Sequence, residues 1–109
     1  MISLNYEEMS SLLGVLADKT RLRILSLLRT DELCVCELEE LVPGSQSNIS
    51  QHLFKLKSFK LVNERKRGQW KYYRINNEIP KIVIEILDLL PDTREEIAAF
   101  RARGSRCRI

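Results

Sequence analysis

The hydrophobic period of this 109-residue chain changes after Leu61. Before that point, apolar residues recur every three or four positions, which is typical of amphipathic helices. After it, residues 61–65 and 70–75 are rich in strand-forming side chains and flank residues 66–69, where we expect a hairpin turn. Further helical periodicity follows. The sequence therefore predicts a mainly α fold with a small β-hairpin.

Two helices are predicted before residue 31. The apolar stripe of the first consists of Tyr6, Met9, Leu12, Leu13, Val15 and Leu16. Thr20 is expected to cap the second helix, which ends near Arg29. The second helix is built on Leu22, Leu25 and Leu28.

The next two helices are short and lie close together in the sequence. The first covers about residues 35–42 and ends at Pro43 and Gly44, and Ser45 occupies the N-cap position of the second, which runs to about Ser58. Two short helices joined by a tight turn resemble a helix-turn-helix, and the hairpin that follows would make it a winged helix-turn-helix.

The last part of the chain is again helical. Pro80 suits the first turn of a helix whose stripe consists of Ile79, Ile82, Val83, Ile86, Leu87 and Leu90. Ile84 and Leu89 lie off that stripe, so the helix is apolar over more of its circumference than a lone surface helix needs, and a partner subunit would explain the excess. A weaker helix over 93–103 completes one domain, residues 1–103. We expect residues 104–109 to form a flexible tail.

Charge is distributed unevenly along the chain. Residues 44–74 hold eight basic side chains and one acidic one, an excess that predicts binding to a polyanion, with nucleic acid as the first candidate and a merely solvated basic face as the alternative. The chain is 44% hydrophobic, yet no apolar run approaches the ~18 residues that span a bilayer. Glu7 and Glu8 stand where a signal peptide would carry positive charge. We therefore expect a cytoplasmic protein that does not enter a membrane.

The helix over 45–58 has a polar outward face. At 3.6 residues per turn, Ile49, Leu53 and Leu56 face the core, whereas Ser47 and Gln51 point the opposite way. Ser and Gln side chains read base edges in the major groove, and Lys binds phosphate. Residues of this helix are thus candidates for DNA contact: Gln46, Ser47, Ser50, Gln51 and Lys55.

His52 is the only histidine, and a bond to a neighbouring element is as consistent with its position as a contact to DNA. A lone His argues against acid–base or triad catalysis, and the sequence has no glycine-rich phosphate loop. We therefore expect a DNA-binding protein that is not an enzyme and that binds DNA without a cofactor.

Cys34 and Cys36 place two thiols within three residues, directly before the helix-turn-helix. Thiolates are soft ligands that favour thiophilic ions. The spacing from Cys34 to Glu37 is that of a capping box, which predicts Cys34 at the N-cap and Cys36 in the first turn. Residues i and i+2 of a helix are about 200° apart, so an ion bound by both sulfurs must distort this turn.

The third cysteine, Cys107, lies between Arg106 and Arg108, which favour its thiolate. It is a candidate third ligand, from its own or a partner subunit. The alternative is a free thiol in the tail.

Several segments, in order, resemble signatures of the ArsR/SmtB family of bacterial metalloregulatory repressors: LADKTRLRILSLL, ELCVCEL, SQSNISQHLFKLK and RKRGQWKYYRI. The segment ELCVCEL further resembles the arsenic-sensing branch. This resemblance implies a homodimer, joined through its first and late helices, that represses a resistance operon on double-stranded operator DNA. Binding of trivalent arsenic or antimony to Cys34 and Cys36 would release the operator. The resemblance also assigns residues to the two DNA-binding elements. On the recognition helix it places Ser45, Gln46, Ser47, Ser50, Gln51 and His52, and in the wing it places Arg65, Lys66, Arg67, Gln69 and Lys71.

One position departs from the arsenic-sensing pattern. Where the third cysteine of well-known arsenic sensors stands, this chain has Glu39. Either Cys107 supplies the missing thiolate, or the site has two ligands, or the inducer differs. Residues 78–103 lack the His ligands of zinc and cobalt sensors, and no cysteine precedes Cys34 as in the cadmium and lead branch.

Three alternatives remain. A repressor of the same fold could sense thiol oxidation, with Cys34 or Cys36 pairing with Cys107, or could respond to cadmium or lead. The third alternative is a thiol oxidoreductase or a small metal-buffering protein that does not bind DNA. The basic hairpin and the Ser/Gln face count against this third alternative.

Overall fold

The computed structural model describes residues 3–43 and 48–104. The elements run in the order α1 (Tyr6–Leu16), α2 (Lys19–Thr30), β1 (Leu33–Cys34), α3 (Val35–Leu41), α4 (Ile49–Ser58), β2 (Val62–Arg67), β3 (Trp70–Ile75), α5 (Lys81–Asp88) and α6 (Arg94–Arg103). Mostly helical, with a hairpin after α3 and α4, the chain has the predicted winged helix-turn-helix architecture. In the described part of the chain, no helix is long and apolar enough to cross a membrane.

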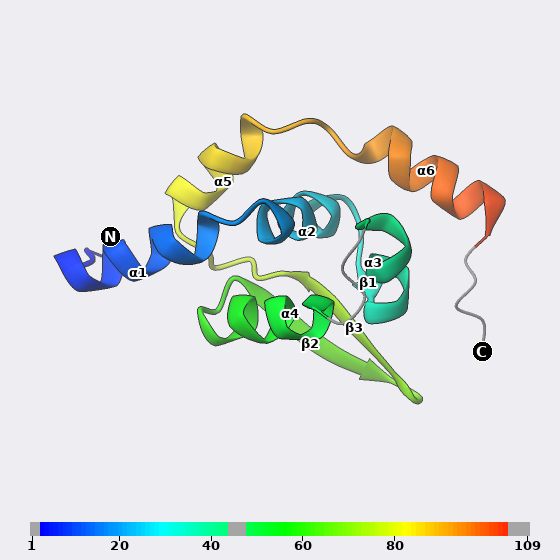
Figure 1. Cartoon of the computed structure of the whole chain (residues 1–109), viewed down its shortest axis with the longest axis horizontal. Helices are drawn as coiled ribbons and strands as arrows, with labels where there is room; N and C mark the ends of the chain where they lie inside the picture. Colours follow the sequence, from blue (N-terminus) through cyan, green and yellow to red (C-terminus); the bar gives the residue numbers. More distant parts are fainter. Residues whose placement is uncertain (1–2, 44–47, 105–109) are drawn as a thin grey trace.

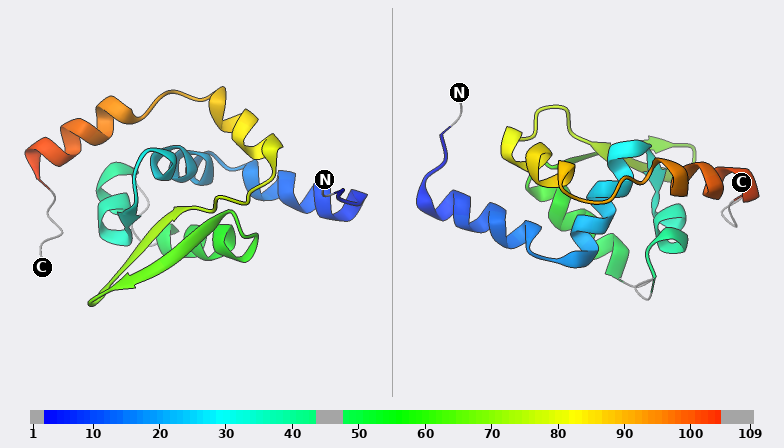
Figure 2. Two further views of the ribbon diagram at one scale, coloured as in Figure 1. Left: turned by 180° about the vertical axis from the view of Figure 1, so that it is seen from behind. Right: turned by 90° about the horizontal axis from the view of Figure 1, so that it is seen from above.

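Helix α2 lies at the centre of the molecule, between α5 and α6 on one side and α4 with the hairpin on the other (Figure 1). It contacts α1, α4, α5, α6 and β3. Its side chains Ile24, Leu25 and Leu27 are fully buried. Two further views show α1 projecting from one end of the molecule and α6 lying at the other end (Figure 2).

The first two helices differ in detail from the sequence prediction. Asp18, not Thr20, caps α2, because its carboxylate accepts hydrogen bonds from the backbone N–H groups of Thr20 and Arg21 at 2.9 and 3.0 Å. In α1, Leu12, Val15 and Leu16 are buried as expected, but Tyr6 is 96% and Leu13 47% exposed. The predicted stripe of α1 is therefore only partly a core face.

Helices α3 and α4 form the predicted helix-turn-helix. The end of α3 at Leu41 agrees with the prediction, whereas the expected N-cap of α4, Ser45, lies outside the described residues. After α4, Lys60 adopts a positive φ of 60°. The N–H of Leu61 bonds the carbonyl of Leu56 at 3.0 Å, which closes the helix end and directs the chain into β2.

The sheet has three antiparallel strands in the order β1-β3-β2. The predicted hairpin is confirmed: β3 has the predicted bounds, whereas β2 ends two residues later than expected. A two-residue turn joins the strands, and in it Gly68 has a φ of 61°. Glycine suits this first turn position because it adopts positive φ without a steric penalty. Strand β1 was not predicted. It pairs Leu33 with Tyr73 and Cys34 with Tyr72.

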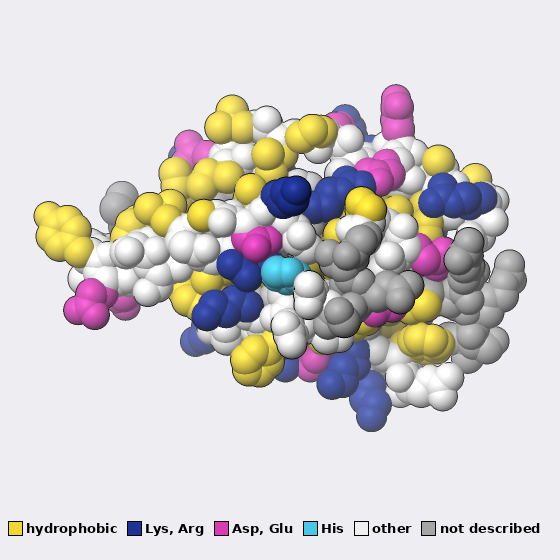
Figure 3. Space-filling model, viewed as in Figure 1, with side chains coloured by type: hydrophobic (Ala, Val, Ile, Leu, Met, Phe, Trp, Pro, Cys, Tyr) yellow, Lys and Arg dark blue, Asp and Glu magenta, His cyan; other side chains and the backbone are white. Residues whose placement is uncertain are grey.

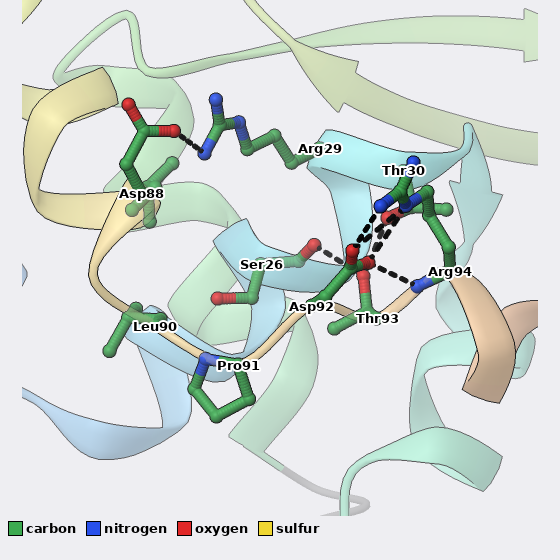
Figure 4. A pocket seen from close by; sticks show the side chains of 10 residues that line it. Ser26, Arg29, Thr30, Asp88, Leu90, Pro91, Asp92, Thr93 and Arg94 are labelled. Carbon is green, nitrogen blue, oxygen red and sulfur yellow. Dashed lines mark hydrogen bonds and ion pairs between the residues drawn. The ribbon is translucent and has the colours of Figure 1, made fainter.

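The segment between α5 and α6 is attached to α2 through Thr93 (Figure 4). The buried Thr93 hydroxyl donates to the carbonyl of Ser26 at 2.9 Å and lies 2.6 Å from the hydroxyl of Thr30. A cavity of about 410 Å³ lies beside this junction. The charged side chains around it pair with one another, Arg29 with Asp88 and Arg94 with Asp92. The hydrogen bonds of Thr93, the N-cap of α6, hold the start of that helix against α2.

Candidate nucleic-acid interface and thiol site

Cys34 lies at the junction of the sheet and the helix-turn-helix. It is the last residue of β1 and the N-cap of α3, and its backbone is extended (φ −91°, ψ 169°). Its N–H donates to Oε1 of Glu37 at 3.0 Å, and the N–H of Glu37 reaches the Cys34 side chain. The capping box predicted from the sequence is therefore confirmed, with sulfur where Ser or Thr is usual.

The two cysteines at this junction differ in exposure and in bonding. Cys34 is a free thiol that is only 3% exposed, whereas Cys36, in the first turn of α3, is half-buried and disulfide-bonded. Burial, supported by the nearby Glu37 carboxylate, raises the pKa of the Cys34 thiol. At neutral pH Cys34 is therefore protonated, and a soft ion that binds its sulfur must displace a proton.

The Glu37 carboxylate connects this junction to the last helix. Glu37 is buried, and its Oε2 accepts a hydrogen bond from Nη1 of Arg101 in α6. Arg101 also donates to Oδ2 of Asp31 at 3.0 Å and to the carbonyl of Glu32 at 3.3 Å. One guanidinium thus joins α6 to both the segment before β1 and the start of α3.

Within residues 3–43 and 48–104, no three His, Cys, Asp or Glu side chains converge in a way that could hold a metal ion. Glu39, at the position where a third cysteine stands in the arsenic-sensing pattern, does not complete such a group. Cys107 lies outside the described residues. In the described part of the chain, the free thiol that suits a thiophilic ion is Cys34, and Cys36 becomes a second donor only when its disulfide is reduced.

The outward face of α4 carries the predicted polar side chains. Ser50, Gln51 and Lys55 are exposed, while Ile49, Leu53 and Leu56 are buried, as predicted. The predicted contact residues Ser45, Gln46 and Ser47 lie outside the described residues. The described part of α4 thus presents hydrogen-bonding groups that can meet base edges.

The hairpin next to α4 is strongly basic. Lys and Arg side chains gather along the lower edge of the molecule, over the hairpin and α4 (Figure 3). The predicted wing residues are all exposed: Arg65, Lys66, Arg67, Gln69 and Lys71. The structure therefore brings the wing and the exposed face of α4 to one side of the molecule (Figure 1).

Two carboxylates offset part of this positive charge. Glu32, directly before β1, lies 2.6 Å from Arg65 and 3.8 Å from Arg67. Glu64 lies 2.8 Å from Lys57 and 3.8 Å from Lys71, and it also accepts a hydrogen bond from the Tyr73 hydroxyl. Lys66 has no ion pair within the described residues. The wing is thus less uniformly basic than the sequence alone indicates.

His52 has a partner on a neighbouring element. It is half-buried, and its Nδ1 lies 3.3 Å from Nη1 of Arg21 in α2. This geometry matches the first of the two roles considered for His52, a bond to a neighbouring element. A contact between His52 and DNA stays a prediction.

Two features of the site escaped the sequence prediction. Strand β1 is two residues long, too short for a recognisable alternating pattern. The contact of Arg101 with Glu37 joins residues 64 positions apart, and local periodicity carries no information about such a pair. The sequence did predict the last helix, with Arg101 in its final turn, but it gave no indication of which residue Arg101 contacts.

Comparison with known proteins agrees with this geometry. A family model described as bacterial regulatory protein, arsR family, matches residues 18–64. The arsenical resistance operon repressor of Staphylococcus xylosus is 35% identical over 104 residues, covering 95% of this chain and 100% of that protein. Among solved structures, HlyU from Vibrio cholerae N16961 has a TM-score of 0.68 and 38% identity, covering 81% of this chain and 96% of the other. A homodimeric winged helix-turn-helix DNA-binding domain from Mycobacterium bovis has a TM-score of 0.63 at 26% identity, covering 91% of this chain and 90% of that one.

Proposed function

Because the chain belongs to the ArsR family of bacterial regulatory proteins, we propose that it is a homodimeric repressor of an arsenic-resistance operon. In this proposal As(III) or Sb(III) binds Cys34 and Cys36 and releases the operator. The family consists of DNA-binding transcriptional regulators, so the chain is a repressor and not an enzyme. The observation that carries the inducer assignment is the position of Cys34, which both ends a wing-paired strand and caps the helix before α4.

DNA binding in this proposal uses two elements. Helix α4 enters the major groove with Gln46, Ser47, Ser50 and Gln51 toward base edges, preceded by Ser45. The hairpin lies along the phosphates with Arg65, Lys66, Arg67, Gln69 and Lys71, and Lys55 adds a phosphate contact from α4. Two-fold symmetry sets the two half-sites about one helical turn of DNA, roughly 34–36 Å, apart.

Inducer binding acts through the first turn of α3. Cys34 and Cys36 are two residues apart, so their side chains diverge by about 200° on a regular helix. Holding one ion with both sulfurs requires Cys34 or Cys36 to move, which disturbs the bonds between Cys34 and Glu37. A lost N-cap costs about 0.5–2 kcal/mol, and allosteric coupling energies are typically about 1–3 kcal/mol. Displacement of α3 is thus sufficient in scale to weaken operator binding through α4.

Cys34 also connects this movement to the wing. Its backbone pairs with Tyr72 of β3, which directly follows the predicted wing residue Lys71. A shift of Cys34 therefore perturbs β3 as well as α3. Cys107, in the proposal, supplies the third thiolate from its own or the partner subunit.

The test measures operator binding and inducer binding on the same reduced protein. A fluorescein-labelled duplex from the region upstream of its gene is followed by anisotropy while As(III) is added, and thiolate-to-arsenic absorption is recorded in parallel. We expect release at stoichiometric As(III) for the unaltered chain and retention of the DNA by Cys34→Ser and Cys36→Ser. Absence of both absorption change and release would refute the arsenic assignment.

Cys107→Ser determines how many thiolates are needed. Loss of release by this variant would make Cys107 a ligand, whereas unchanged release would show that Cys34 and Cys36 suffice. Release by diamide with no response to As(III) would favour a repressor that senses thiol oxidation. Release by Cd(II) or Pb(II) alone would favour a repressor that responds to cadmium or lead.

Salt dependence tests the DNA interface separately. Several phosphate contacts predict a steep fall in affinity between about 50 and 200 mM salt. A flat response would contradict the assignment of the basic surface to DNA while leaving the thiol chemistry untouched.

A further inference from the structure

Phe54 is a large apolar side chain on the outward face of α4. It is 74% exposed. Phe54 follows Gln51 by three residues and Ser50 by four, so the three side chains are neighbours on one helix face. It is thus located among the groups that we propose to read DNA.

The packing of α4 gives no reason for an aromatic residue at this position. The buried face of the helix is completed by Ile49, Leu53 and Leu56. Phe59, the C-cap residue of α4, differs from Phe54. Its side chain packs against the core, and its ring centroid lies 5.6 Å from Nζ of Lys55. Among the described residues, Phe54 has neither of these contacts.

The surroundings of Phe54 match the chemistry of a major groove. The groove presents base-edge hydrogen-bonding groups together with the C5-methyl group of thymine, and Phe is one of the side chains that make apolar contact with that methyl group. Ser50 and Gln51 supply the polar contacts beside Phe54, and Lys55 and Lys57 supply positive charge. A second copy of this basic face would repel the first, so charge complementarity favours DNA over self-association.

We propose that Phe54 is a specificity-determining residue that contacts the C5-methyl group of a thymine in each operator half-site. This inference rests on the proposed function, because it requires α4 to enter the major groove. It adds a sequence preference that hydrogen bonding by Ser and Gln does not supply. Phe54 discriminates thymine from cytosine and from uracil at one base position.

The test removes the two partners of the contact independently. Duplexes that bind the unaltered chain are selected from a random library at fixed salt, and each thymine is then replaced by deoxyuridine, which lacks only the methyl group. In each half-site we expect one thymine whose replacement, made alone, weakens binding about fourfold, because one buried methyl-sized contact is lost. Phe54→Ala should bind the thymine and uracil duplexes equally.

Lys55→Ala is the matched control on the same helix. It should weaken binding to all duplexes alike and keep the preference for thymine, because a phosphate contact carries no sequence information. Circular dichroism of Phe54→Ala should match that of the unaltered chain, since an exposed side chain is removed.

Three outcomes would overturn the inference: tolerance of every deoxyuridine by the unaltered chain, an undiminished thymine preference in Phe54→Ala, or a lower oligomer mass for Phe54→Ala in sedimentation. Failure of the proposed function looks different, because the unaltered chain would then select no duplex sequence at all.

Discussion

Arg101, near the end of α6, donates a hydrogen bond to the carboxylate of Glu37, in the first turn of α3. The other carboxylate oxygen of Glu37 accepts the N–H of Cys34, so a single buried carboxylate joins the last helix to the N-cap of α3. The order of the thiol site therefore depends on a residue that is far from it in the sequence.

Replacing Glu37 tests how much this contact stabilises the fold. Glu37→Ala removes the acceptor of the Cys34 N–H and leaves Arg101 with Asp31 as its remaining carboxylate partner. We expect the free energy of unfolding in urea to fall by about 1–2 kcal/mol. Glu39→Ala, on the same helix, is the control and should cost less than about 0.5 kcal/mol. Equal effects of the two variants would contradict the role given to Glu37.

Glu32 restrains the wing and should oppose DNA binding. Its carboxylate lies 2.6 Å from Arg65 and 3.8 Å from Arg67, two residues that we assign to phosphate contacts. Glu32→Gln should raise DNA affinity about threefold at 50 mM salt, since exposed pairs contribute about 0–1 kcal/mol, and less at 200 mM. Glu39→Gln makes the same change in net charge away from the wing. If it raises affinity equally, the effect comes from net charge and not from the freed arginines.

Tyr73 gives the fold a defined alkaline limit. Burial, together with its hydrogen bond to Glu64, raises the pKa of Tyr73 from 10.0 to about 12. The unfolded chain loses this proton at lower pH than the folded chain, so unfolding becomes easier as the pH rises through the interval from 10.0 to about 12. Urea unfolding between pH 8 and 12 should show this decline. Tyr73→Phe should show a shallower decline, and Tyr72→Phe should behave like the unaltered chain.

The exposed apolar residues of α1 and α5 should form the subunit contact. Leu13 and Ile82 are large hydrophobic side chains on the exposed surfaces of these helices. Leu13→Glu or Ile82→Glu would bury an unpaired charge at the interface, and we expect the dimer dissociation constant to rise at least about tenfold. Sedimentation equilibrium measures this change. Ala98→Glu, on the exposed side of α6, should leave the dimer intact.

Local sequence signals predicted the helices and the hairpin well. The spacing of Cys34 and Glu37 gave the start of α3, because a capping box depends only on residues three apart. Asp18 and Thr20 are both capping residue types, and only the observed hydrogen bonds decide between them. Periodicity also assigned Tyr6 and Leu13 to a buried stripe, since it identifies apolar faces without telling a core from a subunit surface.

Long-range relationships were beyond the sequence. The pairing of β1 with β3, the contact of Arg101 with Glu37 and the pairing of Glu32 with Arg65 each join residues more than 30 positions apart. Each depends on how the elements pack and not on any local pattern. The thiol pair and the wing were therefore predicted separately, while their physical connection was not.

The double position of Cys34, at the end of a strand and the start of a helix, has a consequence for biosensor engineering. In the proposed repressor, altering residue 34 to change the preferred ion would disturb the wing and α3 together with the ion site.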